Sequence, residues 1–371
     1  MKTVIAIDSF KGCLSSVEAN RAAAEGVRSA CPDAEIVEVP VSDGGEGFLE
    51  AFHAAIGGAL VTVPVMDPLM RSISARYLLK GQTAVLEVAE AIGLTLLSPE
   101  ERNPMSASSY GVGQLVADAV KNGARHIIVG LGGSSTTDGG CGAAAAIGVK
   151  FTDAGGREFV PVGGNLHEIA HIDLSGKSAL LDGIEIVTMC DIDNPMYGLN
   201  GAAYIFGPQK GADPEMVKFL DDGLIHLGEI IKRDLGRDLT EVPGGGAAGA
   251  MGVGMMAFFG SRLQMGIETV LDTVGFDEII SDADAIFTGE GKIDSQSLRG
   301  KVVIGVARRA KKQGKDVIAV VGGSDLGMEP AYEEGVKAIF TINRLPQDLS
   351  VSKAFSRENL AFVMDNILRM M

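Results

Sequence analysis

The sequence lacks the cysteine patterns and the long hydrophobic run that several classes of protein require. Its four cysteines, Cys13, Cys31, Cys141 and Cys190, lie far apart and form no Cys-x-x-Cys pair, which argues against structural zinc and a disulfide framework. The longest apolar run, residues 247–260, is shorter than the roughly 18 residues needed to cross a bilayer. The apolar stretch at the N-terminus is too short for a signal peptide. We therefore expect a cytoplasmic protein in a reducing compartment.

Positive charge is also scarce. The chain has 32 lysine and arginine residues against 48 aspartate and glutamate residues, which gives a formal net charge of −16. Such a surface disfavours DNA, RNA and anionic membranes, so we expect no nucleic acid and no membrane as a partner. A small anionic substrate is still compatible with this charge, because a metal ion and a few placed lysines can reverse the sign of the local field.

The length of 371 residues exceeds what one hydrophobic core usually supports, which predicts two domains. Glycine is abundant, with 50 residues and no triplet repeat, so collagen-like structure is excluded. The surplus glycines are expected in turns and in loops that approach a ligand closely, which is where phosphate-binding loops are built.

Short continuous apolar runs recur along the chain, and a glycine-rich or acidic turn follows almost every one. Runs of this kind, separated by helical patterns, are typical of parallel strands that are covered on both faces. The expected strands are residues 4–7, 35–41, 126–129, 285–287, 317–321 and 338–341, with helices expected at 17–30, 114–122 and 301–313. The pattern predicts an α/β fold that contains a Rossmann-like domain built on a parallel sheet.

Two regions interrupt this rhythm. Residues 60–86 alternate in polarity as antiparallel or mixed strands do, and residues 151–265 carry turn-rich segments and longer helices. We interpret both as excursions of the chain that build a second α/β domain. A ligand is expected in a cleft between the domains. The Rossmann-like domain then comprises residues 1–58, 104–148 and 268–371, and the second domain comprises residues 59–103 and 149–267.

The loop at residues 130–140 is the richest in groups that bind phosphate. It reads Gly-Leu-Gly-Gly-Ser-Ser-Thr-Thr-Asp-Gly-Gly, and no Walker A motif occurs anywhere in the chain. Consecutive glycines and hydroxyl residues offer backbone N–H groups that can form an anion-binding nest at a helix start. We therefore predict that Gly132, Gly133, Ser134 and Ser135 bind a nucleotide phosphate.

Carboxylates gather in two further loops. Asp43 lies in a Ser-Asp-Gly-Gly-Glu-Gly loop, where the glycines allow a ligand to approach and a helix start is the simpler alternative. Asp191, Asp193 and Asn194 follow another apolar run. If that strand continues, alternation places the two aspartates on one side, and one of them could act as a base toward a substrate hydroxyl. A common Asp/Asn-Pro turn is the alternative there.

Lysines and carboxylates also occupy the other loops that follow apolar runs. Lys11 follows the first run, where the preceding Asp8 could simply cap the next helix, and Lys210 lies in a tight Gly-Pro-Gln-Lys-Gly turn. Glu290 and Asp294 lie in a Gly-Glu-Gly-Lys-Ile-Asp segment near the C-terminal third of the chain. A polar surface turn is the simpler alternative for each of these segments.

One motif indicates a different chemistry. Residues 167–171 read His-Glu-Ile-Ala-His, which matches the zinc-binding pattern of metallohydrolases in which the glutamate acts as general base. The pattern needs one helix that carries both histidines, and the flanking glycines leave little room for it. A zinc hydrolase that uses His167, Glu168 and His171 stays open as an alternative.

Six motifs occur in order along the chain, and together they carry a resemblance. They are Asp-Ser-Phe-Lys-Gly (8–12), Ser-Asp-Gly-Gly-Glu-Gly (42–47), the loop at 132–140, Cys-Asp-Ile-Asp-Asn-Pro (190–195), Gly-Pro-Gln-Lys-Gly-Ala (207–212) and Thr-Gly-Glu-Gly-Lys-Ile-Asp (288–294). This arrangement resembles the bacterial glycerate kinase family, the one with two α/β domains and no Walker A loop, over essentially the whole chain. The chain departs from the family pattern at Ile7, Cys13, Ser135 and Thr137, and none of these departures removes a charged group.

The resemblance implies transfer of the γ-phosphoryl group of ATP to a hydroxyl of glycerate with Mg²⁺, and 2-phosphoglycerate is the favoured product. Phosphoryl transfer depends on positioning and charge neutralisation more than on covalent chemistry. We expect Asp191 to be the base or orienting group for the substrate hydroxyl, with Lys11 on phosphate and Asp43 as a further catalytic carboxylate. Asp43, Asp193, Glu290 and Asp294 form the pool of carboxylates for Mg²⁺ and substrate hydroxyls, and Glu290 and Asp294 are the expected metal ligands. The residues expected at the substrate are Arg71, Asp193, Asn194 and Lys210, with Arg71 or Lys210 on its carboxylate.

The residue pattern leaves the assembly and one further function open. A monomer and a homodimer are both compatible with the sequence. A non-catalytic module that binds a metabolite or a nucleotide is the second alternative function, although it leaves the density of acidic groups in six loops unexplained.

Overall fold

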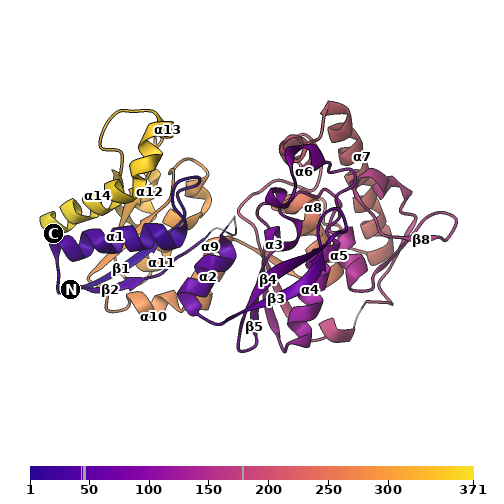
Figure 1. Ribbon diagram of the computed structural model, residues 1–371, viewed down its shortest axis with the longest axis horizontal. Coiled ribbons are helices and arrows are strands. Elements are labelled where there is room, and N and C mark those ends of the chain that lie inside the picture. The colour runs from indigo at the N-terminus through magenta and orange to yellow at the C-terminus, as the bar shows by residue number, and fades with distance from the viewer. Residues whose placement is uncertain (43, 45–46, 178) are drawn as a thin grey trace. The chain divides into compact units, whose positions relative to one another are not determined.

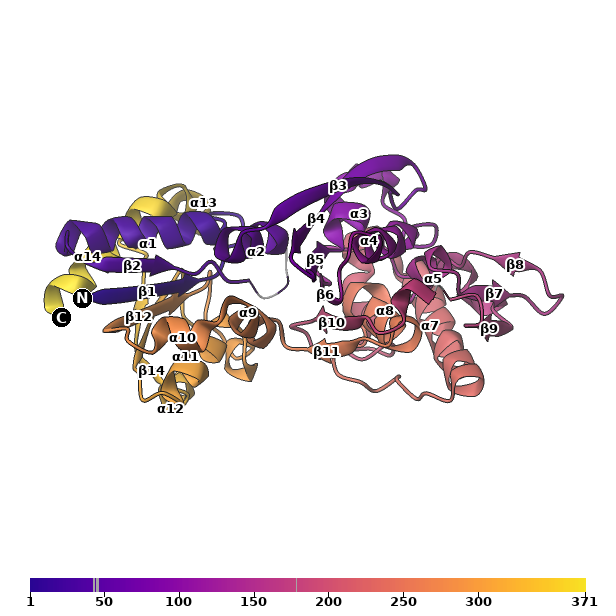
Figure 2. The same cartoon turned by 90° about the horizontal axis from the view of Figure 1, so that it is seen from below.

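The computed structural model describes residues 1–42, 44, 47–177 and 179–371, and the chain divides into two compact units (Figures 1 and 2). Unit 1 comprises Met1–Asp43, Glu50–Gly57 and Met265–Met371, and unit 2 comprises Gly44–Leu49 and Gly58–Gln264. The helix α2 (Phe48–Ile56) begins in the short segment of unit 2 and continues into unit 1. Both units alternate strands with helices, which confirms the predicted α/β class.

The elements of unit 1 come from the two ends of the chain. They are β1 (Lys2–Ile7), α1 (Ser16–Ala30), β2 (Glu35–Glu38), α9 (Gly266–Val274), α10 (Phe276–Ile280), β12 (Ala285–Gly289), α11 (Val302–Lys311), β13 (Val317–Val321), α12 (Pro330–Glu333), β14 (Val336–Thr341), α13 (Leu349–Ser352) and α14 (Ser356–Met370). The strands form one sheet in the order β14-β13-β12-β1-β2, and every neighbouring pair is parallel.

Helices cover both faces of this sheet. Ile5, Ile7 and Phe287 are buried in one cluster with residues of α1 and α14, whereas Val4 and Ile286 alternate with them and are buried on the opposite face. Figure 2 shows α1 and α11 on opposite sides of β1 and β12. Near-continuous burial along β1 therefore follows from coverage on both faces, as the unbroken apolar run in the sequence predicts.

The start of α1 is specified locally. Ser15 is the N-cap residue, its hydroxyl accepts a hydrogen bond from the backbone N–H of Glu18, and the Glu18 carboxylate accepts one from the N–H of Ser15 in return. These hydrogen bonds cap the helix at Ser15, so Asp8 does not cap α1.

Unit 2 contains a larger sheet and a smaller one. Its elements are β3 (Ala59–Met66), β4 (Ser72–Lys80), β5 (Thr83–Glu87), α3 (Ala89–Ile92), α4 (Tyr110–Lys121), β6 (His126–Gly130), α5 (Cys141–Ala146), β7 (Lys150–Thr152), β8 (Glu158–Phe159), β9 (His171–Asp173), β10 (Glu185–Met189), α6 (Ala202–Phe206), α7 (Pro214–Leu235), α8 (Ala247–Gly254) and β11 (Arg262–Gln264). The large sheet has the order β11-β10-β6-β5-β4-β3, and β8, β7 and β9 form the small antiparallel sheet. β5, β6, β10 and β11 are parallel, while β3 and β4 run antiparallel as the alternation over residues 60–86 predicts.

Shorter helical turns connect these elements. The 3₁₀ turns are η1 (Leu94–Leu96), η2 (Pro99–Glu101), η3 (Gly163–Glu168), η4 (Ala179–Leu181), η5 (Pro208–Lys210), η7 (Ser297–Arg299) and η8 (Lys353–Phe355), and η6 (Met255–Phe259) is a π-helical turn. Within the described part of the chain, no helix is both long enough and apolar enough to cross a membrane.

The placement of β6 corrects one prediction. The sequence pattern assigned residues 104–148 to the same domain as β1, but β6 pairs with β5 on one side and with β10 on the other. The whole stretch from Gly58 to Gln264 belongs to unit 2, so residues 104–148 do not return to unit 1. A buried parallel strand has the same apolar pattern in either sheet, so local sequence does not tell which strands are its neighbours.

Candidate active site

Three parallel strands of unit 2 end at one level. The register pairs Glu87 at the end of β5 with Gly130 at the end of β6, and Gly130 with Met189 at the end of β10. In open parallel sheets, ligands bind beyond the carboxyl ends of the strands. The sheet therefore brings the glycine-rich loop after Gly130 beside the acidic segment after Met189.

The glycine-rich loop is buried except at its tip. The backbone N–H and the hydroxyl of Ser135 both donate to the carbonyl of Ile92, each at 2.9 Å. Ser134 and Ser135 are buried, Gly132 is half-buried and Gly133 is exposed. Of the four residues predicted to bind phosphate, the tip at Gly132 and Gly133 is therefore the accessible part.

The helix start that follows this loop is already occupied by a carboxylate of the chain. Asp138 accepts hydrogen bonds from the N–H groups of Gly140 (3.0 Å) and Gly142 (3.2 Å), at the beginning of α5. It also accepts from the N–H (2.8 Å) and the hydroxyl (2.7 Å) of Ser109. Burial raises the pKa of Asp138 and these hydrogen bonds oppose that rise. Asp138 therefore takes the place of an anion at this helix start, and phosphate binding by residues 132–135 stays a prediction.

Replacing Asp138 with asparagine tests this account. Asparagine keeps the shape but turns an N–H₂ group toward donors that need an acceptor, so we expect the free energy of unfolding to fall by about 2–4 kcal/mol. Chemical denaturation monitored by circular dichroism measures the change. Asp222→Asn is the control, since Asp222 is exposed and pairs with the exposed Lys218, and it should lower stability by less than about 1 kcal/mol. Equal effects of the two variants would contradict the capping role.

The acidic segment after β10 is a turn and not a continued strand. β10 ends at Met189, so the strand does not continue through Asp191 and Asp193, and the condition for placing these two side chains on one side by alternation is not met. Asp191 is half-buried and Asp193 is exposed. The side-chain amide of Asn194 donates to the carbonyl of Asn200 at 2.7 Å, which closes the turn. The segment thus holds Asp191 just beyond the end of the sheet.

Lys210 lies away from solvent and does not fit its predicted contact with the substrate. Its side chain is 2% exposed. Its Nζ donates to the carbonyl of Thr136 at 2.6 Å and to the hydroxyl of Ser134 at 3.2 Å. Burial lowers the pKa of Lys210 to about 7, although the Asp138 carboxylate acts in the opposite direction. Lys210 therefore contacts the glycine-rich loop from inside the protein.

Arg71 occupies the turn between β3 and β4, where two carboxylates hold its guanidinium group. Its Nε donates to Asp67 at 2.6 Å and one terminal nitrogen donates to Glu101 at 2.7 Å. These contacts raise the pKa of Arg71, Asp67 foremost. The side chain is about half exposed, and Asp67 also accepts a hydrogen bond from the backbone N–H of Arg71, which stabilises the turn.

In unit 1 two carboxylates follow paired strand ends. Ile7 of β1 is in register with Gly289 of β12, and the next residue on each strand is Asp8 and Glu290 respectively. Both carboxyl-bearing residues are buried. Asp8 was not among the predicted site residues, and the signal that could have identified it is a charged residue directly after a fully apolar strand.

The loops that follow these strands lie next to one another. A Cβ added to Gly291 would lie 3.5 Å from the backbone nitrogen of Lys11, whose side chain is exposed. Asp294 uses Oδ1 to accept from the N–H groups of Gln296 (2.8 Å) and Ser297 (3.2 Å), which caps η7. The structure thus brings Lys11 close to the Gly289–Asp294 segment. Within that segment, Asp294 makes local hydrogen bonds to the backbone at the start of η7.

Glu87 is a further residue that the sequence interpretation missed. Its carboxylate accepts hydrogen bonds from the N–H groups of Gly47 (3.3 Å) and Leu49 (3.0 Å), at the start of α2. A carboxylate directly after the apolar end of β5 is again the signal that could have found it. Asp43 lies outside the described residues. The carbonyl of Gly44 accepts a hydrogen bond from the N–H of Gly132 at 3.1 Å.

The fold contradicts the alternative of a zinc hydrolase that uses His167, Glu168 and His171. His167 lies in η3, which ends at Glu168, whereas His171 begins the strand β9. The two histidines therefore do not share a helix, and the ring of His167 packs edge-on against Phe219. Among the described residues, no three His, Cys, Asp or Glu side chains are grouped to hold a metal ion.

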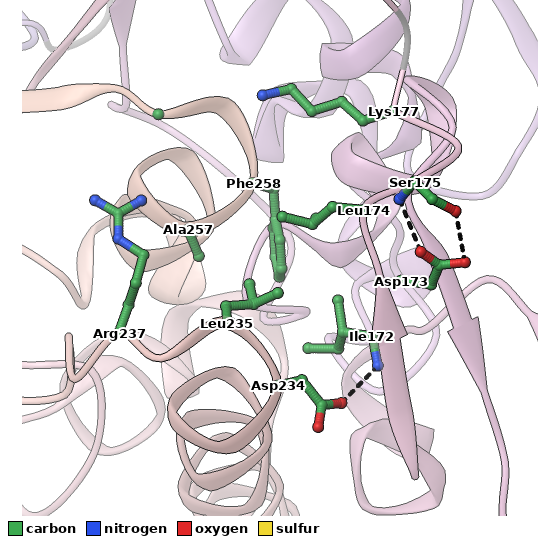
Figure 3. Close-up of a pocket in the computed structure, with 11 residues that line it drawn as sticks. Ile172, Asp173, Leu174, Ser175, Lys177, Asp234, Leu235, Arg237, Ala257 and Phe258 are labelled. Atoms are coloured by element: carbon green, nitrogen blue, oxygen red, sulfur yellow. Dashed lines mark hydrogen bonds between the residues drawn. The ribbon is translucent and has the colours of Figure 1, made fainter.

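Unit 2 also contains a hollow of about 830 Å³ that is separate from these loops (Figure 3). Its walls are β9 with the following turn, the end of α7 and residues near Phe258, and its described lining includes none of the predicted site residues. Asp234 accepts from the N–H of Ile172 at 2.9 Å, and Asp173 accepts from the N–H and hydroxyl of Ser175. The carboxylates of Asp173 and Asp234 thus hold the walls of this hollow in place through hydrogen bonds within the protein.

Comparisons with known proteins agree over nearly the whole chain. Residues 3–371 match the model of the glycerate kinase family. The chain is 45% identical to the glycerate 2-kinase of Escherichia coli strain K12, over 92% of this chain and 90% of that relative. It is 42% identical to the glycerate kinase of Bacillus cereus, over 99% of this chain and 97% of that relative. A solved structure described as a candidate glycerate kinase 2 of Salmonella typhimurium LT2 matches with a TM-score of 0.87 and 40% identity, over 100% of this chain and 98% of that one.

Proposed function

The chain belongs to the glycerate kinase family and is a kinase, and from this premise we propose that it transfers the γ-phosphoryl group of ATP to the 2-hydroxyl of glycerate. The product would be 2-phosphoglycerate. The observation that carries the choice of hydroxyl is the 45% identity, over 92% of the chain, to a relative named glycerate 2-kinase. Because the family consists of kinases, the alternative function of a module that binds its ligand without reaction no longer has support.

In unit 2 we assign Asp191 to the substrate hydroxyl and the tip of the glycine-rich loop to phosphate. Asp191 is half-buried beyond the end of β10, one strand away from the loop that follows β6. A carboxylate there can accept the hydroxyl proton as the oxygen attacks phosphorus, which is the role of a general base. The N–H groups near Gly133 can donate to phosphate oxygens, because glycine lets the backbone approach them closely. Asp193 and Asn194 stay assigned to the substrate.

In unit 1 we assign Lys11 to phosphate and Glu290 and Asp294 to Mg²⁺, with Asp43 as a further carboxylate. Carboxylate oxygens are the donors that Mg²⁺ prefers, and one or two of them suffice because phosphates and water complete the shell. Glu290 is buried beside Asp8 in the register of the sheet, so Asp8 joins this group. Mg²⁺, when bound with ATP, would neutralise charge on the phosphate oxygens. Lys11 would add a point charge on the same side of the sheet.

Phosphorus NMR tests the proposed reaction directly. The purified chain would be incubated with ATP, Mg²⁺ and D-glycerate, and the spectrum recorded without proton decoupling. We expect a new phosphomonoester signal split into a doublet, because the phosphate of 2-phosphoglycerate couples to a single proton. A triplet would identify 3-phosphoglycerate and overturn the choice of hydroxyl. Unchanged ATP with D- and L-glycerate would overturn the activity, and a parallel reaction with EDTA tests the metal requirement.

A further inference from the structure

Lys210 is delivered to the inside of unit 2 by a turn with little freedom. The N–H of Ala212 donates to the carbonyl of Gly207, which closes the turn around η5. Gly211 adopts a left-handed φ of +95°, and a Cβ at this position would lie 2.3 Å from the carbonyl oxygen of Arg102. Glycine is therefore required after Lys210, and the turn directs the lysine side chain into the protein.

The side chain reaches a part of the glycine-rich loop that two other sets of contacts also hold in place. The loop is fixed at Ser135 by Ile92 and at Asp138 by the start of α5. Lys210 contacts the residues on both sides of Ser135, through the carbonyl of Thr136 and the hydroxyl of Ser134. Thr136 is fully buried, so its carbonyl needs a donor from the protein.

Filling of space does not explain why a lysine is buried at this position. Removing an ammonium group from water is unfavourable, and an apolar side chain of similar length would fill the space without that penalty. A hydrogen-bond donor at this place can, in addition, hold the backbone from Ser134 to Thr136 in one conformation. The exposed tip at Gly132 and Gly133 directly precedes that path, and so its orientation depends on it.

We propose that Lys210 is a positioning residue that holds the glycine-rich loop so that the backbone N–H at its exposed residue Gly133 faces the phosphates of the nucleotide. The inference rests on the proposed kinase function and replaces a direct contact between Lys210 and the substrate. It assigns the lysine to nucleotide affinity and to orientation of the transferred group. It also predicts that glycerate affinity depends little on this side chain.

The test compares Lys210→Met with Lys218→Met in steady-state kinetics. Lys218 is an exposed lysine of α7 in the same unit, and its replacement should change nothing measurable. For Lys210→Met we expect the KM for ATP to rise and kcat to fall, by about 10–100-fold in kcat/KM, since a misplacement near 1 Å can have such an effect. The KM for glycerate should change less than about threefold. A larger rise in the KM for glycerate than in the KM for ATP would overturn the proposal in favour of direct substrate binding.

Hydrogen exchange followed by mass spectrometry separates positioning from general loss of structure. In Lys210→Met we expect faster exchange in peptides that cover residues 132–137 and unchanged exchange in α4 and β6. Faster exchange throughout unit 2, or no change in the loop, would each contradict a local role. This readout does not depend on turnover. If the wild type failed to phosphorylate glycerate, the proposed function would fall while the loop measurement would still decide the inference.

Chemical rescue provides a second variant in case the methionine does not pack. Lys210→Ala removes three methylenes and the ammonium group, which together correspond to propylammonium. Added propylammonium should restore at least part of the ATP-dependent activity and of the loop protection, whereas 1-propanol, of similar size but uncharged, should restore less. Equal rescue by the two compounds would mean that the lysine only fills space.

Discussion

Replacing Asp191 with asparagine is expected to lower kcat by about 10²–10⁴-fold, the range in which general bases contribute. Asparagine preserves the size of the side chain, so the turn that Asn194 closes should persist and the protein should stay folded. The KM values for ATP and glycerate should change little, because the contact is made to a proton that moves in the transition state. Steady-state kinetics with thermal unfolding of each variant measure both effects.

Asp193→Asn is the control variant for Asp191→Asn. Asp193 lies two residues further along and is exposed, so the two variants differ in position and not in chemistry. We expect Asp193→Asn to raise the KM for glycerate and to leave most of kcat. If Asp191→Asn retained more than about a tenth of the wild-type kcat, the assignment of Asp191 as the base would have to be abandoned.

Replacing Gly249 with alanine is expected to have the largest effect on stability. Residues 248–250 have three successive positive φ values, of 53°, 70° and 65°. A Cβ on Gly249 would lie 2.0 Å from the carbonyl oxygen of Thr136 and 2.6 Å from the Cα of Thr137, both backbone atoms. We expect the free energy of unfolding to fall by about 3–5 kcal/mol, from left-handed strain together with overpacking. Denaturant unfolding measures this loss.

Gly260→Ala is the matched control for Gly249→Ala. Gly260 has φ +72°, nearly the same as Gly249, and an added Cβ there would meet no atom within 4 Å. Its replacement should therefore lower the stability only by the strain of the left-handed conformation, about 1–2 kcal/mol. The difference between the two variants isolates the steric clash with the glycine-rich loop. Equal losses would show that the close approach of Gly249 to Thr136 does not contribute.

Most strands could be predicted from the sequence, because burial on both faces leaves a continuous apolar run. The expected strand at 317–321 coincides with β13, and the antiparallel pair over 60–86 followed from alternation. The partners of a strand could not be predicted, as β6 shows, because its own residues are equally apolar in either sheet. Sheet membership depends on contacts that lie far away in sequence.

The sequence indicated which loops contain the candidate site, but it did not indicate what each side chain in those loops does. Strand ends identified the loops that contain Asp191 and Glu290, because ligands bind there in parallel sheets. The burial of Lys210 was not predictable, since lysine is almost always exposed and only tertiary structure brings Thr136 to its ammonium group. The sequence indicated no role for Asp138, whose hydrogen bonds to the start of α5 became visible only in the folded chain.

The central insertion in unit 1 also determines the order in which a growing chain can fold. β1 lies between β2 and β12, so one side of the first strand is covered by residues 285–289. Unit 2 ends at Gln264, and all of its strand partners have therefore been synthesised before any residue of β12 exists. Contacts between the two ends of a chain have the highest contact order and form slowly. Until the ribosome has passed β12, β1 lacks this second neighbour, whereas all strands of unit 2 have already been synthesised and can pair.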